Sequence, residues 1–281
     1  MRRAASLAFV LVLVTADFAQ SPAPAQSSVP AGWPTAQFAS AKDPSVQKSF
    51  QILNQMIRAL GGDAWLNVRD MQSEGRTYGF YHGQPNSTGL VFWRFWEWPD
   101  KERIELTKQR DVVELFTGDK GYEITYKGTA TQDPKEMQDY LRRRDHSLEW
   151  VVRNWLPAAG TMILYSGTAL VERNLADQIT VLNASNDSVT LSIDGTSRLP
   201  VKISYSWRDP SDRQFDEEST VFSNYKPVQG VQTPYSTVRY RDGDMTSQRF
   251  MTSFTYNTGL APTLFEPKGT IYTPGKQPSG K

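Results

Sequence analysis

Residues 90–98 read Leu-Val-Phe-Trp-Arg-Phe-Trp-Glu-Trp and hold three of the eight tryptophans in the chain. Alternate side chains of a β-strand point to opposite faces, so a half-buried strand normally has one apolar and one polar face. Here both faces are apolar: one carries Leu90, Phe92, Trp96 and Trp98, and the other carries Val91, Trp93 and Phe95. We therefore expect both faces of this strand to be covered.

Two interpretations of this strand stay open. In the first, Trp93 and Phe95 pack on a helix, while the aromatic residues of the other face cover an outer groove. In the second, apolar area that the protein itself does not fill lines a cavity for a ligand. In both, Arg94 lies between Phe92 and Trp96, where its guanidinium can stack on either ring and shield it from water.

Composition limits the classes of function. The chain has 281 residues, of which 38% are hydrophobic and 22% charged, as is typical of a soluble protein with a core. A net charge of +1 gives no long-range attraction to nucleic acid, so no nucleic-acid partner is expected. The chain contains no cysteine, which excludes disulfides, thiolate metal sites and a lipid anchor attached through that residue.

The N-terminus has the pattern of a secretory signal peptide. Arg2 and Arg3 precede an uncharged apolar run over residues 4–14, which is too short to span a bilayer. We predict a signal peptide over 1–25, a flexible Pro-, Ala-, Ser- and Gln-rich lead-in over 26–42, and no transmembrane anchor. The mature protein is then exported, and the periplasm is the expected compartment.

Periodicity predicts a helix followed by many strands. Asp43 caps a helix that begins at Pro44, carries one apolar stripe from Val46 to Leu60 and ends at Gly61-Gly62. Twelve strand-like segments follow between residues 71 and 257, and a second helix, Pro134–Leu156, interrupts them. We predict one domain over 43–267 and a loose tail over 268–281.

No pattern for catalysis or for a metal or cofactor stands out. The two histidines, His82 and His146, do not have the spacing of zinc ligands, and no Gly-x-Ser-x-Gly motif occurs. An acidic stretch that resembles a solvated hairpin contains Asp209, Asp212, Asp216, Glu217 and Glu218, although paired carboxylates can hydrolyse glycosides. The sequence therefore predicts a protein that is not an enzyme, with a secreted hydrolase as a minor alternative.

Two stretches resemble a known family. The first is Ala-Leu-Gly-Gly-Asp-Ala-Trp-Leu-Asn-Val over 59–68, followed by Ser-Glu-Gly at 73–75. The second runs from Phe222 through Gly230-Val231 and Arg241-Asp242-Gly243 to the closing Leu264-Phe265-Glu266-Pro267. They resemble the outer-membrane lipoprotein-sorting (LolA/LolB-like, including RseB-like) superfamily, and the resemblance spans roughly residues 46–267.

The resemblance implies a fold and a role. The fold is mainly β, an incomplete antiparallel β-barrel of about eleven strands in a meander, with an N-terminal helix and an inserted helix covering its concave side. The carriers of this family hold lipoprotein acyl chains in that concavity, and other members are receptors or stress-signalling regulators. No residue here matches a known functional residue of the carriers.

The leading hypothesis is an exported, monomeric, lipid-binding or lipoprotein-carrier-like protein whose partners are lipid or lipoprotein acyl chains. The alternative is a periplasmic sensor or protein-binding module on the same fold. Helix Pro134–Leu156 is the candidate lid. The candidate cavity residues are Phe92, Trp93, Phe95, Trp96, Leu115, Leu148, Val152 and Trp155.

Overall fold

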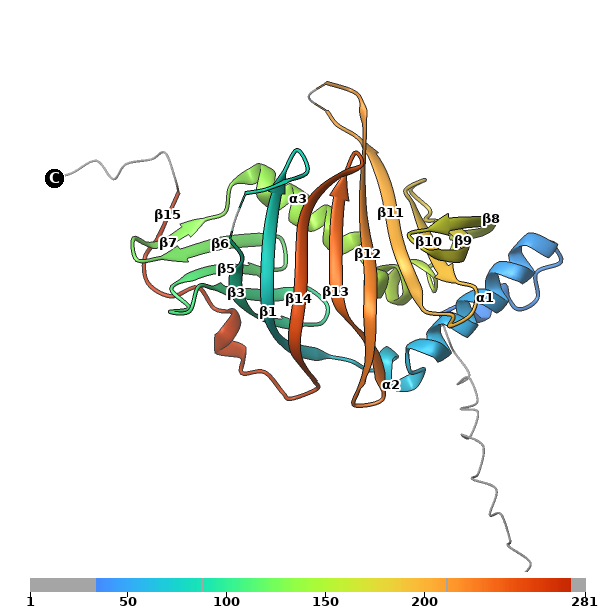
Figure 1. The fold of residues 1–281 in the computed structure, drawn as a ribbon, viewed down its shortest axis with the longest axis horizontal. Helices are drawn as coiled ribbons and strands as arrows, with labels where there is room; N and C mark the ends of the chain where they lie inside the picture. The colour runs from blue at the N-terminus through green and yellow to red at the C-terminus, as the bar shows by residue number, and fades with distance from the viewer. Residues whose placement is uncertain (1–33, 87, 211, 274–281) are drawn as a thin grey trace, which may run out of the picture.

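The structure, a computed structural model, describes residues 34–86, 88–210 and 212–273. The predicted signal peptide and the first part of the lead-in lie outside the described residues. The described chain forms one large sheet that does not close into a barrel (Figure 1). Its fifteen strands are β1 (Asp70–Tyr81), β2 (Gln84–Pro85), β3 (Leu90–Glu97), β4 (Lys101–Leu106), β5 (Val112–Thr117), β6 (Lys120–Thr125), β7 (Gly128–Thr131), β8 (Met162–Val171), β9 (Asn174–Leu182), β10 (Ser188–Asp194), β11 (Pro200–Arg208), β12 (Phe215–Val228), β13 (Val231–Arg241), β14 (Asp244–Tyr256) and β15 (Ile271–Tyr272).

The prediction of a mainly β, incomplete antiparallel barrel with covering helices is confirmed. Each of the twelve predicted strands has a counterpart, and the structure adds β2, β7 and β15, which have two, four and two residues. Such short strands carry too few alternations to be recognised from periodicity. β15 pairs in parallel with β7 through Ile271 and Tyr272, within the segment predicted as a loose tail.

The sheet consists of two meanders joined by a long-range pairing. Its strand order is β15-β7-β6-β5-β4-β3-β1-β14-β13-β12-β11-β10-β9-β8. β1 pairs along its length with β14, from Met71 opposite Tyr256 to Gly79 opposite Ser247. The segment between β7 and β8 carries the inserted helices, which Figure 1 shows behind the central strands.

The first helix forms as its capping signals predict. α1 (Pro44–Leu60) begins after Asp43, whose carboxylate accepts hydrogen bonds from the backbone N–H groups of Ser45 and Val46. Its buried stripe packs on one end of the sheet. α2 (Asp63–Leu66) follows directly after Gly61-Gly62 and buries Trp65.

The prediction of one continuous helix over Pro134–Leu156 is wrong. The structure has α3 (Pro134–Asp145), then α4 (Leu148–Trp150) and a π-helical turn (Val151–Trp155). The helix breaks at His146-Ser147 because the Ser147 hydroxyl accepts a hydrogen bond from the Trp150 backbone N–H and so caps a new helix. The apolar stripe keeps its period across the break, and the pattern therefore did not reveal it.

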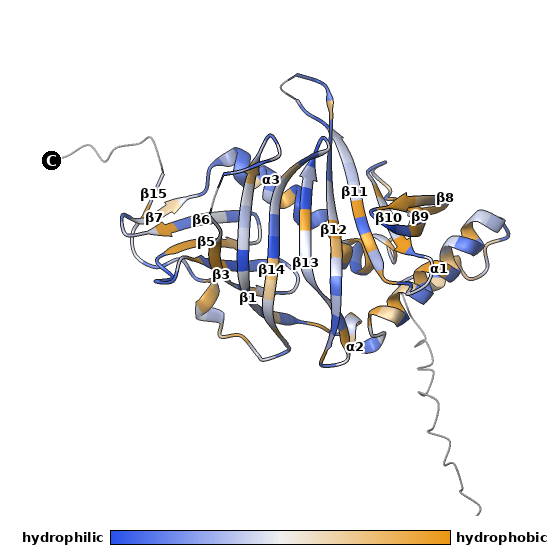
Figure 2. Ribbon diagram, in the orientation of Figure 1, coloured by the Kyte–Doolittle hydropathy of each residue, from blue (hydrophilic) through white to orange (hydrophobic). Residues whose placement is uncertain are grey.

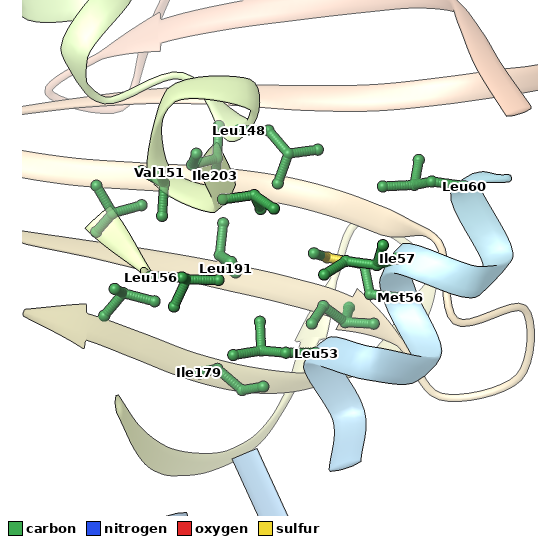
Figure 3. Packing of buried hydrophobic residues seen from close by; sticks show 14 of the residues in the cluster. Leu53, Met56, Ile57, Leu60, Leu148, Val151, Leu156, Ile179, Leu191 and Ile203 are labelled. Carbon is green, nitrogen blue, oxygen red and sulfur yellow. The ribbon is translucent and has the colours of Figure 1, made fainter. Parts of the chain in front are cut away.

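The main core fills one half of the concave side. Leu53, Met56 and Ile57 of α1 are fully buried, as are Ile179 and Leu191 of the sheet. Figure 3 shows these side chains converging with those of the 148–156 segment. α1 and residues 148–156 thus cover β8–β11 with a packed apolar layer. Figure 2 shows hydrophobic residues along α1 and along β8–β10.

A smaller core lies on the opposite face of the sheet. Leu115 of β5 packs with Leu260 and Phe265 from the segment after β14, and Phe95 of β3 packs against them. The Leu264-Phe265 plug therefore covers the convex side of β3–β5.

Gly61 allows α1 to dock on the sheet. Its φ of +125° is disfavoured for side-chain-bearing residues, and a Cβ placed there would lie 2.3 Å from the Gly230 carbonyl oxygen. We expect Gly61→Ala to lower the free energy of unfolding by more than about 1 kcal/mol, because the new methyl group meets backbone that cannot swing aside. Urea denaturation measures this change. Gly83→Ala is the control for glycine conformation alone, since Gly83 also has positive φ but has open space around it.

Candidate binding cavity

The other half of the concave side is open. A cavity of about 300 Å³ lies between β3–β5 on one side and β11–β14 on the other, beneath the α3–α4 segment. Pockets that bind small molecules have volumes of about 300–1,000 Å³, so this cavity is at the small end of that range. The cavity adjoins the main core, because Leu148, Ile203 and Tyr205 belong to both.

The cavity wall contains both apolar and ionisable side chains. The apolar members come from α2, the sheet and α4: Trp65, Val68, Met71, Trp96, Ile104, Phe116, Leu148, Ile203 and Phe222. The charged members are six arginines and four glutamates: Arg94, Arg143, Arg144, Arg153, Arg239, Arg249, Glu102, Glu114, Glu149 and Glu218. The concavity is therefore amphipathic.

Side chains alternate between the two faces of β3, so only some of the predicted cavity residues can lie on the cavity side. Trp96 lines the cavity, and so does Leu148. Phe92 is on the same face of β3, buried beneath Arg249, whose guanidinium carbon is 5.6 Å from the centre of the ring. Val152 and Trp155 are buried in the main core beside the cavity.

The remaining predicted residues lie on the convex face of the sheet. Phe95 and Leu115 belong to the small core under Phe265. Trp93 donates a hydrogen bond of 3.0 Å from its indole N–H to Glu74, and the Arg110 guanidinium lies 4.1 Å above its ring. Each face of the 90–98 strand is thus covered, one by the cavity and its lid and the other by surface side chains and the C-terminal plug.

An ion pair between β3 and β4 crosses the cavity floor. Arg94 Nε donates a hydrogen bond to Glu102 Oε1. Burial by itself would lower the pKa of Arg94 and raise the pKa of Glu102, but their mutual attraction outweighs it in both cases. The pKa of Arg94 is raised and that of Glu102 is lowered, so both groups stay charged.

Glu114 has a different environment from Glu102. No hydrogen bond or ion pair involves its carboxylate within the described part of the chain, although it lines the same cavity. Burial raises its pKa, with the nearby Arg249 acting in the opposite direction. The neutral form of Glu114 is therefore favoured relative to an exposed glutamate.

The Arg142-Arg143-Arg144 run of α3 splits between three environments, as expected for residues about 100° apart. Arg142 lies 4.1 Å above the Trp207 ring and pairs with Asp139. Arg144 donates to the Gly118 carbonyl and lies 4.9 Å from the Trp150 ring. Arg143 reaches the cavity without an ion-pair partner among the described residues.

α3 bridges the mouth of the cavity. Tyr140 stacks on Phe116 of β5, with ring centres 3.7 Å apart, and Arg142 reaches Trp207 of β11. Tyr140 is the only buried residue of α3, whereas Val151, Val152 and Leu156 beyond the break are fully buried. The apolar anchoring of the inserted segment is therefore concentrated after Ser147.

Sequence reasoning missed the charged half of the lining. Arg239 lies between Val238 and Tyr240, a pattern that ordinarily marks a solvent-facing side. Arg249 follows Gln248, and Glu218 lies between Glu217 and Ser219, so neither has a sequence pattern that indicates burial. No local sequence signal shows that a helix covers the face of the sheet that carries these residues. Only the position of α3 places these charges inside a cavity.

No group of three or more His, Asp or Glu residues that could hold a metal ion occurs in residues 34–86, 88–210 and 212–273. Over those same residues, no helix is long and apolar enough to cross a membrane.

Comparison with known proteins gives structural likeness without sequence likeness. No protein-family model matches the chain, and no curated protein matches it. A DUF1329 family protein from Desulfovibrio piger is 14% identical, with a TM-score of 0.53 over 78% of this chain and 97% of its own. A putative outer membrane lipoprotein-sorting protein domain from Vibrio parahaemolyticus is 9% identical, with a TM-score of 0.50 over 78% of this chain and 96% of its own. At these identities the likeness concerns the fold.

Proposed function

We propose that this chain, which has the fold of the outer-membrane lipoprotein-sorting proteins, is an exported, non-enzymatic carrier of a lipid or of the acyl part of a lipoprotein, acting in the periplasm. The observation that supports the proposal is the cavity left beneath α3, with Trp96, Ile104 and Phe116 in its apolar wall. Burial of an acyl chain needs such a surface and no reactive group.

The size of the cavity limits the mode of binding. Burial of one methylene contributes about 0.8 kcal/mol, so even part of one chain supplies measurable affinity. A volume of about 300 Å³ corresponds to roughly ten water molecules, and a long acyl chain therefore needs further room. We infer that α3 is the lid, because it buries only Tyr140 while the 148–156 segment stays in the core.

The carboxylates behind the hydrolase alternative do not form a matched pair. Asp216 accepts a hydrogen bond from Arg241, while Glu217 is 57% exposed in its side chain and lies 3.7 Å from Lys202. Successive residues of β12 point to opposite faces, so these two groups do not share a cleft. A binding role accounts better for the open concavity.

The protein-binding alternative has one observation in its favour. β8 is the last strand of the sheet, and Met162, Leu164 and Leu170 along it are exposed. An exposed strand edge can accept an added strand from a partner. α1 already uses part of this edge, since the Ser45 hydroxyl accepts a hydrogen bond from the Tyr165 backbone N–H. We therefore rank this alternative second.

Lipid extraction tests the carrier. Organic extracts of the purified protein are analysed by mass spectrometry, and dodecyl phosphate is titrated by calorimetry into protein stripped of lipid. We expect bound lipid or dodecyl phosphate in the wild type and a loss of at least about tenfold in affinity for Trp96→Ala, since removing one aromatic wall exposes several methylenes.

Trp93→Ala is the matched control, because it removes the same side chain from the opposite face of the same strand. It should bind like the wild type. Equal binding by both tryptophan variants, or no bound lipid together with no uptake of dodecyl phosphate, would contradict the carrier.

A further inference from the structure

Among the described residues, three arginines of the cavity make no side-chain hydrogen bond with the protein. Of the six arginines in the lining, three are occupied by groups of the protein. Arg94 binds Glu102, and Arg144 binds Asp145 and the Gly118 carbonyl. Arg153 donates to the backbone carbonyls of Val68 and Trp65, at 2.7 and 2.8 Å. Arg143, Arg239 and Arg249 remain.

The guanidinium group of each of these three arginines has few partners for hydrogen bonds or ion pairs within the protein. Arg249 contacts the Phe92 ring and takes part in no hydrogen bond or ion pair with the described residues, and the same absence holds for Arg143. Arg239 has Glu218 at 3.5 Å, yet its Nε is buried without a hydrogen-bond partner. A buried guanidinium N–H is costly without an acceptor, so a ligand that supplies one would bind favourably at Arg239.

The fold brings the three arginines together. Arg249 of β14 pairs with Thr237 of β13, which makes Arg239 its diagonal neighbour on the same face, at a Cα separation of roughly 7–8 Å. Arg143 comes from α3 on the opposite side of the cavity. The residues thus converge from the floor and from the lid.

The positive charges of the three arginines repel one another. Burial, then the charges of Arg239 and Arg94, lower the pKa of Arg249 to about 10. Burial and then the charge of Arg143 lower the pKa of Arg239, and Glu218 only partly opposes this. An anion placed among the three would relieve this repulsion and would supply hydrogen-bond acceptors for their N–H groups.

We propose that Arg143, Arg239 and Arg249 bind a phosphate group, the polar end of an anionic amphiphile whose chain lies against the apolar wall at Trp96. Guanidinium groups present paired N–H donors that match phosphate oxygens, and three such groups neutralise a doubly charged phosphate. The inference rests on the proposed carrier function and names the class of its cargo. It also accounts for a cavity wall that contains both apolar and charged side chains.

Three probes separate the contribution of the phosphate head group to binding from that of the alkyl chain. Calorimetry at low salt compares the binding of dodecyl phosphate, the uncharged dodecyl maltoside and inorganic phosphate. The two amphiphiles are kept below their critical micelle concentrations. We expect the wild type to bind dodecyl phosphate at least about tenfold more tightly than dodecyl maltoside. Arg249→Gln and Arg239→Gln should each weaken dodecyl phosphate about tenfold and leave dodecyl maltoside unchanged.

Two further variants make the comparison specific. Arg76→Gln removes the same charge from an exposed position on β1 that does not line the cavity, and it should bind like the wild type. Glu114→Gln removes a carboxylate whose ionised form competes with the anion, so it should tighten dodecyl phosphate at alkaline pH, where the raised pKa of Glu114 no longer keeps the group neutral. This second variant is expected to raise the affinity, whereas the arginine variants lower it. It therefore still tests the site if circular dichroism shows that an arginine variant does not fold.

The outcomes distinguish the two proposals. Equal affinity for dodecyl phosphate and dodecyl maltoside, unchanged by the arginine and Glu114 variants, would overturn the phosphate site and leave the carrier. Equal affinity for inorganic phosphate and dodecyl phosphate, unchanged by Trp96→Ala, would overturn the carrier and leave an anion site. Binding of none of the three probes would overturn both.

Discussion

Leu53→Ala is expected to lower the free energy of unfolding by about 2–5 kcal/mol. Leu53 is fully buried between α1 and the sheet, in the layer that Figure 3 shows. The truncation removes the transfer free energy of its lost carbon atoms and leaves a cavity, because the rigid strands beneath cannot close in. Urea denaturation followed by circular dichroism measures the change.

Gln55→Ala is the matched control, since it lies on the exposed side of the same helix. It should change the free energy of unfolding by no more than about 0.5 kcal/mol. A Leu53→Ala variant as stable as Gln55→Ala would show that α1 does not form part of the core.

Breaking the Arg94–Glu102 pair is expected to be the next largest effect. Glu102→Leu leaves the charge of Arg94 without its hydrogen-bonded partner in the cavity wall, and Arg94→Met does the same to Glu102. Loss of one member of a buried pair costs about 3–5 kcal/mol, and the 29% exposure of the Arg94 side chain places this pair at the low end.

The double variant Arg94→Met/Glu102→Leu shows whether the two charges stabilise each other, because its stability is compared with the sum of the two single losses. It removes both charges at once, so it should be less destabilised than the sum of the two single variants by more than 1 kcal/mol. Denaturation of the four proteins under one condition gives this coupling energy. Additive losses would mean that the two charges do not depend on each other in the folded protein.

The pair also has a consequence for the cavity. Glu102 neutralises Arg94, and Glu218 lies 3.5 Å from Arg239, whereas Arg143 and Arg249 have no ion-pair partner among the described residues. An acyl chain alone would leave these guanidinium groups without acceptors. An amphiphile with an anionic head satisfies both parts of the wall, and the proposed cargo follows from that requirement.

Local patterns predicted a large share of the fold. Asp43 and Asp133 each cap a helix as their positions before Pro44 and Pro134 indicate. The alternation of apolar residues predicted twelve strands. Both signals act within a few residues, because capping and pleating depend on near neighbours along the chain. The helix break at Ser147 escaped prediction because a capping side chain inside an intact apolar stripe does not change the period.

The candidate site was predicted only in part. Phe92, Trp96 and Leu148 were named from apolar patterning and lie on the cavity side, while Trp93, Phe95 and Leu115 lie on the convex side. The period of two separates the faces of a strand but does not say which face turns inward. That choice depends on the pairing of β1 with β14 and on the side that α3 crosses.

The sequence by itself determined that residues 90–98 form a strand with two apolar faces, within a mainly β protein that carries one early helix and one insertion. The tertiary structure alone decided that Arg239, Arg249 and Arg143 meet in a cavity with Trp96. The reason is physical: patterning records what each residue needs from its immediate surroundings, whereas the sharing of one cavity by a strand, a distant hairpin and a helix is set by long-range pairing and by curvature of the sheet.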